Sequence, residues 1–190
     1  MYIIITASPN KDGLTSACGK AMYDGIVSKG GSAKIYDICE DKLKPCLVCG
    51  DGWGTCYGKA ICVIDDILLE IRNEIRACEG LTLVTPVYFG QPSEIMKYFI
   101  DRFRRLEVFN EANGSAATDK MVDLIAAAGG SGNGNTSCLN EMEIWCRQVG
   151  AIMRERIGVT RYNRNQMLKV IYDAGERFVT GDYFNVKLPT

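Results

Sequence analysis

Four cysteines lie close together in the chain, and their thiolates are suited to holding a soft metal centre. Two residues separate Cys46 from Cys49, so both sulfurs can face one ion, and Cys56 and Cys62 follow at wider spacing. Several glycines around them favour an irregular loop that can wrap such a centre. This pattern suits an iron–sulfur cluster or zinc, and an empty reduced site or disulfides are the alternatives. The odd total of nine cysteines argues against a fully paired disulfide framework.

The chain contains no histidine, which narrows its chemistry more than any motif does. Activation of a serine or cysteine nucleophile by histidine, zinc sites with imidazole ligands and ordinary proton shuttling near neutral pH are all excluded. An enzyme with this sequence must rely on a cofactor, a metal, carboxylates, tyrosine or lysine.

Three further segments, residues 8–16, 85–90 and 129–134, carry residues that could hold a ligand. The first combines hydroxyls with the start of an expected helix, whose free N–H groups can bind a phosphate. The second ends a strand in two aromatics and a glycine, which can pack against a flat heterocycle, and the third is glycine-rich enough for close backbone approach. The alternatives are a simple helix cap, aromatic cover for the core and a mobile surface loop. Because neither G-x-G-x-x-G nor a Walker A loop follows the first strand, a mononucleotide is favoured over a dinucleotide.

The elements that must position these segments alternate along the chain. Apolar runs predict strands at residues 2–6, 34–38, 81–85, 121–128 and 152–159. Stripes of helical period predict helices between them, the clearest running from Ile64 to Cys78 with Asp65 and Asp66 in its first turn. The alternation predicts one α/β domain over residues 1–190, with a doubly wound parallel sheet and an irregular cysteine-rich insert at about residues 40–62, between the second strand and second helix. In such a sheet the three ligand-binding segments converge at the carboxyl edge.

Charge and hydropathy exclude several other classes of protein. The formal net charge of −1 provides no broad positive field, so we expect neither nucleic acid nor a membrane as partner. The apolar run at the N-terminus is too short for a secretory signal, and no stretch approaches the roughly 20 apolar residues that cross a bilayer. We therefore predict a cytoplasmic protein.

Several segments together resemble one family, that of the NADPH-dependent FMN reductases and iron–sulfur flavoproteins. The resemblance covers nearly the whole chain in order, and its most specific part runs from Pro86 to Arg102. The matching residues are Ser8, Pro9, Gly13, Leu14, Thr15, Ser16, Asp65, Asp66, Thr85, Pro86, Val87, Tyr88, Phe89, Gly90, Met96, Lys97, Asp101 and Arg102. It implies a flavodoxin-like fold with five parallel strands in the order 2-1-3-4-5 and FMN as the prosthetic group.

The resemblance also implies which residues contact FMN. The phosphate would be held by Ser8, Asn10, Thr15 and Ser16. The isoalloxazine ring would be bordered by Pro86, Val87, Tyr88, Phe89, Gly90, Gly130, Ser131 and Gly132.

Three features of this chain depart from the family pattern or qualify it. The family usually has arginine where Asn10 stands and asparagine where Leu14 stands, so either the affinity for phosphate is lower here or Lys11 supplies it. Iron–sulfur members place a third cysteine where Gly52 stands here, so Cys56 would serve instead. A 4Fe–4S cluster on Cys46, Cys49, Cys56 and Cys62 remains the leading hypothesis for the insert. Asp101 and Arg102 are interpreted as a structural ion pair on a helix.

The function implied is an NAD(P)H-dependent oxidoreductase of the flavin or quinone reductase type, with the nicotinamide cofactor as a transient substrate. The alternatives are an iron–sulfur flavoprotein that carries electrons, and a non-enzymatic redox-sensing or flavin-binding module. A small redox acceptor or an electron-transfer protein would be the partner, and the resemblance implies a homodimer or homotetramer.

Overall fold

Five parallel strands form the central sheet in a computed structural model that describes residues 1–110 and 113–182. The strand order is β2-β1-β3-β5-β6. The strands are β1 (Tyr2–Thr6), β2 (Ala33–Asp37), β3 (Gly80–Tyr88), β5 (Met121–Ala128) and β6 (Ile152–Thr160). Because β5 and β6 are the fourth and fifth strands that the sequence predicts, the flavodoxin-like order 2-1-3-4-5 is confirmed. A strand that the sequence does not predict, β4 (Gln91–Pro92), pairs antiparallel with the end of β3.

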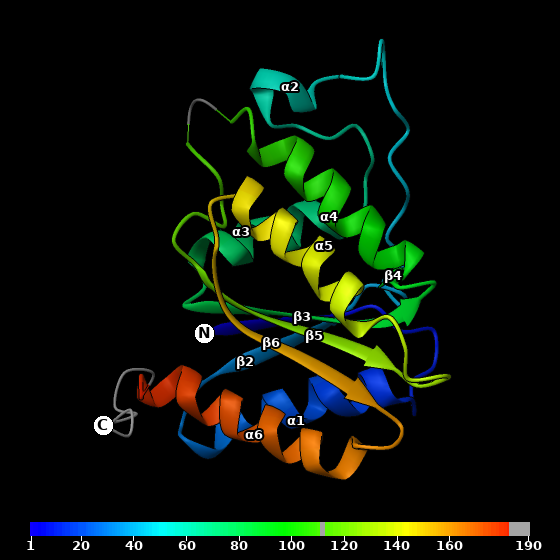
Figure 1. Cartoon of the computed structure of the whole chain (residues 1–190). Helices are drawn as coiled ribbons and strands as arrows, with labels where there is room; N and C mark the ends of the chain where they lie inside the picture. Colours follow the sequence, from blue (N-terminus) through cyan, green and yellow to red (C-terminus); the bar gives the residue numbers. More distant parts are fainter. Residues whose placement is uncertain (111–112, 183–190) are drawn as a thin grey trace, which may run out of the picture.

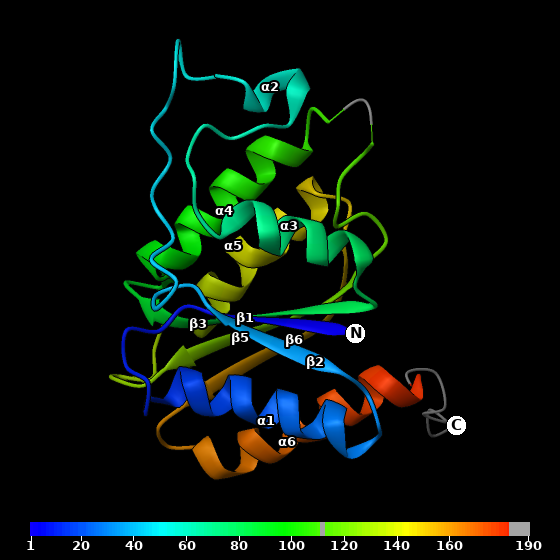
Figure 2. The ribbon, with the colours of Figure 1, turned by 180° about the vertical axis from the view of Figure 1, so that it is seen from behind.

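Helices cover both faces of the sheet (Figure 1). On one face lie α1 (Leu14–Ser28) and α6 (Arg164–Thr180), which Figure 2 shows side by side from behind. On the other face lie α3 (Leu68–Ala77), α4 (Glu94–Glu107) and α5 (Asn135–Gln148). In the described residues, no helix is both long and apolar enough to cross a membrane.

Side chains alternate between the two faces of each strand, so the strands contribute apolar residues to the core on both sides of the sheet. In β1, Ile3 and Ile5 face the α3–α4–α5 layer, while Ile4 faces α1 and α6. All three side chains are completely buried, as expected for a parallel strand that is covered on both faces. The α1–α6 layer packs tightly, since a Cβ atom added at Gly25 would lie 2.0 Å from the carbonyl oxygen of Tyr172.

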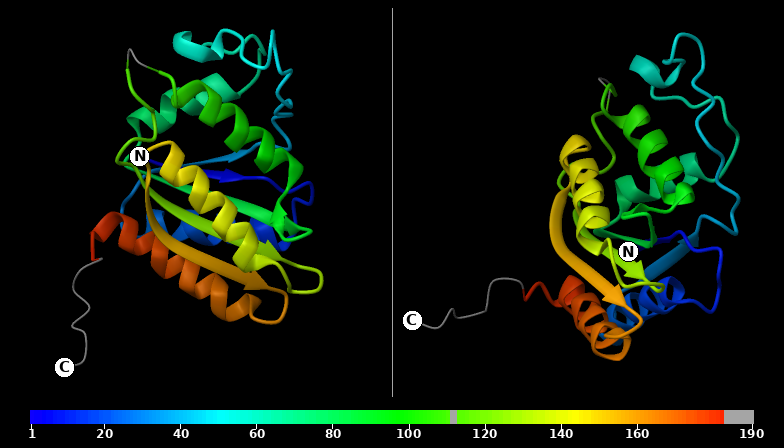
Figure 3. Two further views of the ribbon diagram at one scale, coloured as in Figure 1. Left: turned by 45° about the horizontal axis from the view of Figure 1, so that its top comes forward. Right: turned by 45° about the vertical axis from the view of Figure 1, so that its right-hand side comes forward.

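The cysteine-rich segment leaves the carboxyl end of β2 and runs over the α3–α4 layer, on the side of the sheet opposite α1 and α6 (Figure 3). It contains one short helix, α2 (Cys56–Lys59), and returns into α3. The insert is therefore supported by helices rather than by the sheet.

The start of α3 differs from the prediction. The apolar stripe predicts a helix from Ile64, but the helix begins at Leu68, and Asp66 precedes it. The Asp66 carboxylate accepts a hydrogen bond from the N–H of Leu68 (3.3 Å). Ile64 is nevertheless buried. The apolar stripe therefore identifies the residues that face the core, but it does not show where the helix begins.

Candidate functional site

The three predicted loops meet at the carboxyl edge of the sheet. They enclose an open cavity of about 210 Å³. Among the predicted FMN contacts, the cavity is lined by Ser8, Asn10, Thr15, Pro86, Val87, Tyr88 and Gly130. Pro9, Gly13, Leu14, Ala127 and Gly129 also line it and were not in the predicted set. Loops that lie far apart in the sequence thus form one hollow where sheets of this topology hold ligands.

The first loop wraps around its own backbone. The carbonyl oxygen of Asn10 accepts hydrogen bonds from Ser8 Oγ (3.2 Å), Ser16 Oγ (3.0 Å) and the N–H of Gly13 (3.1 Å). The side-chain oxygen of Asn10 accepts the N–H of Asp12 (3.1 Å). These bonds fix the loop against the start of α1.

The N-terminus of α1 is suited to a phosphate. Gly13 occupies the N-cap position without a side-chain cap, and the first turn contains no acidic residue. Thr15, which is buried, lies inside the helix, so the interpretation of Thr15 or Ser16 as a simple cap is wrong. First-turn N–H groups and the positive end of the helix dipole therefore face the cavity edge without an anionic cap. This arrangement fits the phosphate of FMN.

The second loop presents aromatic residues to solvent. Tyr88 is 45% exposed and Phe89 is fully exposed, so the alternative that they cover the core is wrong. Phe89 has φ +50° and Gly90 has φ +77°, which turns the chain sharply between β3 and β4. Tyr88 lines the cavity, whereas Phe89 and Gly90 are not among its lining residues.

The third loop closes against the second. Ser137 Oγ donates a hydrogen bond to the carbonyl oxygen of Gly90 (2.8 Å), and a Cβ atom added at Gly134 would lie 2.7 Å from the Cα atom of Gly90. A Cβ atom at Gly130 would instead meet nothing within 4 Å, so this backbone is open to a ligand. Ser131 and Gly132 are not among the cavity's lining residues.

Lys11 does not line the cavity. Its ammonium group pairs with Glu40 (2.6 Å) and borders a neighbouring hollow of about 410 Å³, together with Ser16 and Asp37. The structure therefore does not bear out Lys11 as the substitute for the arginine that the family usually has. None of the lining residues of the candidate FMN cavity is charged.

A second cavity, of about 30 Å³, lies beneath the insert. Its lining includes Cys46, Cys49, Cys56, Cys62, Arg102 and Arg105. All four cysteines thus line one cavity, and the chemistry of thiolates suits a metal centre there. As placed, however, the described residues contain no group of three or more cysteine, aspartate or glutamate side chains that could hold a metal ion. The 4Fe–4S site stays a prediction, and binding would require the insert to tighten.

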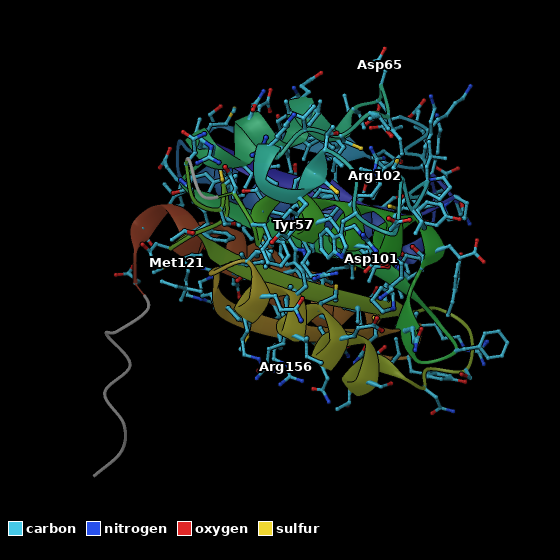
Figure 4. The ribbon with its side chains drawn as sticks, turned by 90° about the horizontal axis from the view of Figure 1, so that it is seen from above. Tyr57, Asp65, Asp101, Arg102, Met121 and Arg156 are labelled. Carbon is cyan, nitrogen blue, oxygen red and sulfur yellow. The ribbon has the colours of Figure 1, made fainter. Side chains whose placement is uncertain are left out.

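Arg102 lines this cavity and is only 2% exposed. Its Nη1 and Nη2 atoms donate to the two carboxylate oxygens of Asp66 (2.5 and 3.0 Å). Burial opposes ionisation of Asp66, but the bonds from Arg102 and from backbone N–H groups outweigh it and hold its pKa below the ordinary value. Figure 4 shows Arg102 and Asp101 on different sides of α4. Arg102 therefore forms a buried ion pair, but its partner is Asp66 and not Asp101, which pairs with Lys97 (3.7 Å) instead.

The fold defines a flavodoxin-like protein, and the cavity is its candidate mononucleotide site at the carboxyl edge of the sheet. A family model described as NADPH-dependent FMN reductase matches residues 2–162, and the chain belongs to this family of oxidoreductases. Among curated proteins, it is 29% identical over 104 residues to an iron–sulfur flavoprotein of Methanocaldococcus jannaschii, which covers 55% of this chain and 52% of the relative. It is 25% identical over 149 residues to the iron–sulfur flavoprotein of Methanosarcina thermophila, covering 78% and 74%.

Solved structures agree on the fold. An NAD(P)H:quinone oxidoreductase from Methanothermobacter marburgensis superposes with a TM-score of 0.73 at 15% identity, covering 94% of this chain and 96% of that one. A WrbA-like flavodoxin from Agrobacterium tumefaciens gives 0.61 at 15% identity, with 95% of each chain covered. Among the curated relatives, the chain spans only about half the length of the iron–sulfur flavoprotein of Methanocaldococcus jannaschii.

Proposed function

We propose that the chain is an FMN-dependent oxidoreductase that takes electrons from NAD(P)H and delivers them to a flavin- or quinone-type acceptor. The observation that carries this proposal is the single cavity that Ser8, Thr15, Tyr88 and Gly130 line together. When bound, FMN would supply the redox chemistry: with one proton from solvent it takes up a hydride, and two electrons later pass to the acceptor. No protein acid or base is compulsory, which suits a chain without histidine.

The residues of the cavity divide into two groups. Ser8 and Thr15, with the first-turn N–H groups of α1, would hold the phosphate through neutral donors and the helix dipole. Pro86, Val87 and Tyr88 would border the ring on one side, and the open backbone of Gly130 on the other. The half-exposed Tyr88 at the rim would shield the ring from water while leaving one approach for a nicotinamide donor.

The test separates recognition of the phosphate from recognition of the ring. The metal-free protein without flavin is titrated with FMN and with riboflavin, which lacks the phosphate, while the quenching of flavin fluorescence is followed. We expect Thr15→Val and Ser8→Ala to weaken FMN binding about tenfold each, because each removes one hydrogen bond to a charged group. Riboflavin affinity should stay unchanged.

The exposed Ser32, far from the loops in sequence, provides the control, since Ser32→Ala should alter neither affinity. Equal losses for FMN and riboflavin would contradict the assignment of the phosphate site. A colourless wild-type protein that refuses added FMN would leave only the non-enzymatic redox-sensing module.

A second candidate function, electron carriage through a 4Fe–4S cluster, is supported by the shared cavity of the four cysteines and by the printed names of the curated relatives. Anaerobic purification followed by measurement of iron, sulfide, zinc and flavin per chain tests it. Cys56→Ser should lower the iron content, whereas Cys39→Ser, at a half-buried cysteine outside the cavity, should not. Zinc without sulfide would point to a structural site instead.

Assembly into a homodimer or homotetramer is part of the proposal. The fully exposed Phe89 ring beside the cavity supports it, since a second copy could cover this ring. Light scattering during size-exclusion chromatography measures the assembly. Phe89→Ser should shift it toward the monomer, whereas Tyr162→Ser, at an exposed aromatic on another loop, should not.

A further inference from the structure

Arg102 joins the insert to α4 from below. Its Nη1 atom donates to the carbonyl oxygen of Lys44 (2.8 Å), and its Nη2 atom donates to the sulfur of Cys62 (3.3 Å). The ion pair with Asp66 completes this set. One guanidinium therefore contacts the beginning and the end of the insert, and it donates to the sulfur of one of the four cysteines that line the cavity.

A purely structural role does not account for the whole side chain. The Nε–H group of Arg102 is buried and finds no acceptor among the described residues. A buried donor of a charged group without a partner is unfavourable, so tethering of the insert alone leaves part of the guanidinium unsatisfied. Because Arg102 also lines the cavity, an anionic occupant would lie beside this guanidinium.

The surroundings of the cavity set the sign of the charge that it can accept. Arg102 and Arg105 are the charged residues in its lining, and both are cations. A centre held by four thiolates carries net negative charge, and hydrogen bonds to its sulfurs and nearby charges set its reduction potential. The lining thus suits an anionic thiolate-bound centre better than a bare cation.

We propose that Arg102 is a positioning residue for an anionic metal–thiolate centre in the cysteine cavity, acting through the sulfur of Cys62. Its hydrogen bond fixes this ligand, and its buried positive charge favours the more reduced, more negative state of the centre. The proposal rests on the iron–sulfur candidate described above.

The test compares variants of the full chain after anaerobic reconstitution with iron and sulfide. Iron and sulfide per chain are measured, and the midpoint potential of the centre is followed by electron paramagnetic resonance during a redox titration. Arg102→Gln should lower the potential, and Arg102→Lys, which keeps a positive charge, should restore most of it. Asp66→Asn should raise the potential, because it leaves the charge of Arg102 uncompensated.

If Arg102 acts through its charge, the two variants should shift the midpoint potential in opposite directions. Simple damage to the fold would shift the potential of both variants in the same direction. Arg105→Gln is the matched control. Arg105 lines the same cavity and donates to the carbonyl oxygen of Gly52 (2.6 Å), but no hydrogen bond joins it to a sulfur in the described residues. Its iron content should equal that of the wild type, and its potential should move less than that of Arg102→Gln.

Three outcomes would overturn the proposal. If Arg102→Gln matches the wild type in both iron content and potential, the centre exists without help from Arg102. If Arg102→Gln and Asp66→Asn shift the potential in the same direction, the effect is structural. If the wild type binds no iron at these cysteines, the cluster and the role of Arg102 fail together, while the flavin content of the same samples still reports on the FMN site.

Discussion

Ser93 donates a hydrogen bond from its Oγ atom to the carbonyl oxygen of Ala7, 3.1 Å away. The same Oγ atom accepts the N–H of Met96 (3.4 Å) and caps α4. The N–H of Ser93 donates to Thr85 Oγ1 (3.0 Å). Because Ala7 precedes the first loop of the FMN cavity and Thr85 begins the second, one buried serine ties both loops to the start of a helix.

Replacing Ser93 by alanine should weaken both the fold and the cavity. The variant loses a helix cap and leaves the carbonyl oxygen of Ala7 without this partner, so we expect the free energy of unfolding to fall by about 1–2 kcal/mol. Urea denaturation of the flavin-free protein measures this loss, and FMN titration should show weaker binding. Ser93→Thr keeps the hydroxyl and should lie near the wild type. An alanine variant with wild-type stability would show that this bond contributes nothing.

Gly134 should tolerate no side chain. Its φ is +87°, and a Cβ atom would lie 2.7 Å from the backbone of Gly90. Gly30 has a similar φ of +80° but an open surrounding, so Gly30→Ala should cost only the backbone strain of about 1–2 kcal/mol. Gly134→Ala should cost more, and it should also weaken FMN binding because it pushes the second and third loops apart. Equal losses in the two variants would mean that the contact between Gly134 and Gly90 yields easily.

The sheet and the meeting of the three loops were predictable because both follow from local pattern and from a topological rule. Apolar runs such as Ile3 to Ile5 need two covered faces, which implies parallel strands with helices on both sides. Once the strand order is known, the carboxyl ends must share an edge. The three loops on that edge could therefore be located from the sequence without knowledge of any distance, whereas the individual FMN contacts were implied only by the family resemblance.

Partners distant in sequence were not predictable. Arg102 stands beside Asp101 in sequence, yet it pairs with Asp66, 36 residues away, because α4 turns adjacent side chains to different sides. Lys11 likewise pairs with Glu40, which only the packing of the insert brings near. The start of α3 was missed for a related reason: apolar periodicity reports burial, and Ile64 is buried outside the helix.

The contribution of Asp123 to stability should fall as the pH rises from about 4 to about 6. This carboxyl is completely buried in β5, and burial raises its pKa to about 6 despite its ion pair with Arg154. In this window the folded state binds more protons at Asp123 than the unfolded state does, so deprotonation costs folding free energy, up to about 3 kcal/mol. Above pH 6 the contribution levels off.

Urea denaturation at several pH values checks the slope. Asp123→Asn should abolish this component, so the difference between wild type and variant should change with pH between 4 and 6 and become flat above it. Asp65→Asn, at the exposed carboxylate that Figure 4 shows projecting from the surface, should keep the wild-type slope. If the difference in unfolding free energy between wild type and Asp123→Asn does not change between pH 4 and 6, Asp123 is protonated only below pH 4.

Alkylation should separate the cysteines of the insert from those of the core. Burial raises the pKa of Cys18, Cys138 and Cys146 to about 12, so almost no reactive thiolate is present at pH 8. Iodoacetamide should therefore label the native, reduced and metal-free protein mainly at the half-buried cysteines of the insert, Cys46, Cys49, Cys56 and Cys62. Peptide mass spectrometry identifies the labelled sites, and labelling of Cys138 at a similar rate would show that the α5 layer opens readily.

The same labelling reports which sulfurs hold a centre, because a coordinated thiolate is protected from alkylation. If the insert binds a cluster through all four cysteines, reconstitution should protect the four to the same extent. The labelling of Cys56 shows whether all four cysteines bind the centre. Cys56 would replace the cysteine that iron–sulfur members of the family have at the position of Gly52. Protection of Cys46, Cys49 and Cys62 with continued labelling of Cys56 would mean that three thiolates hold the centre and that its fourth position is open.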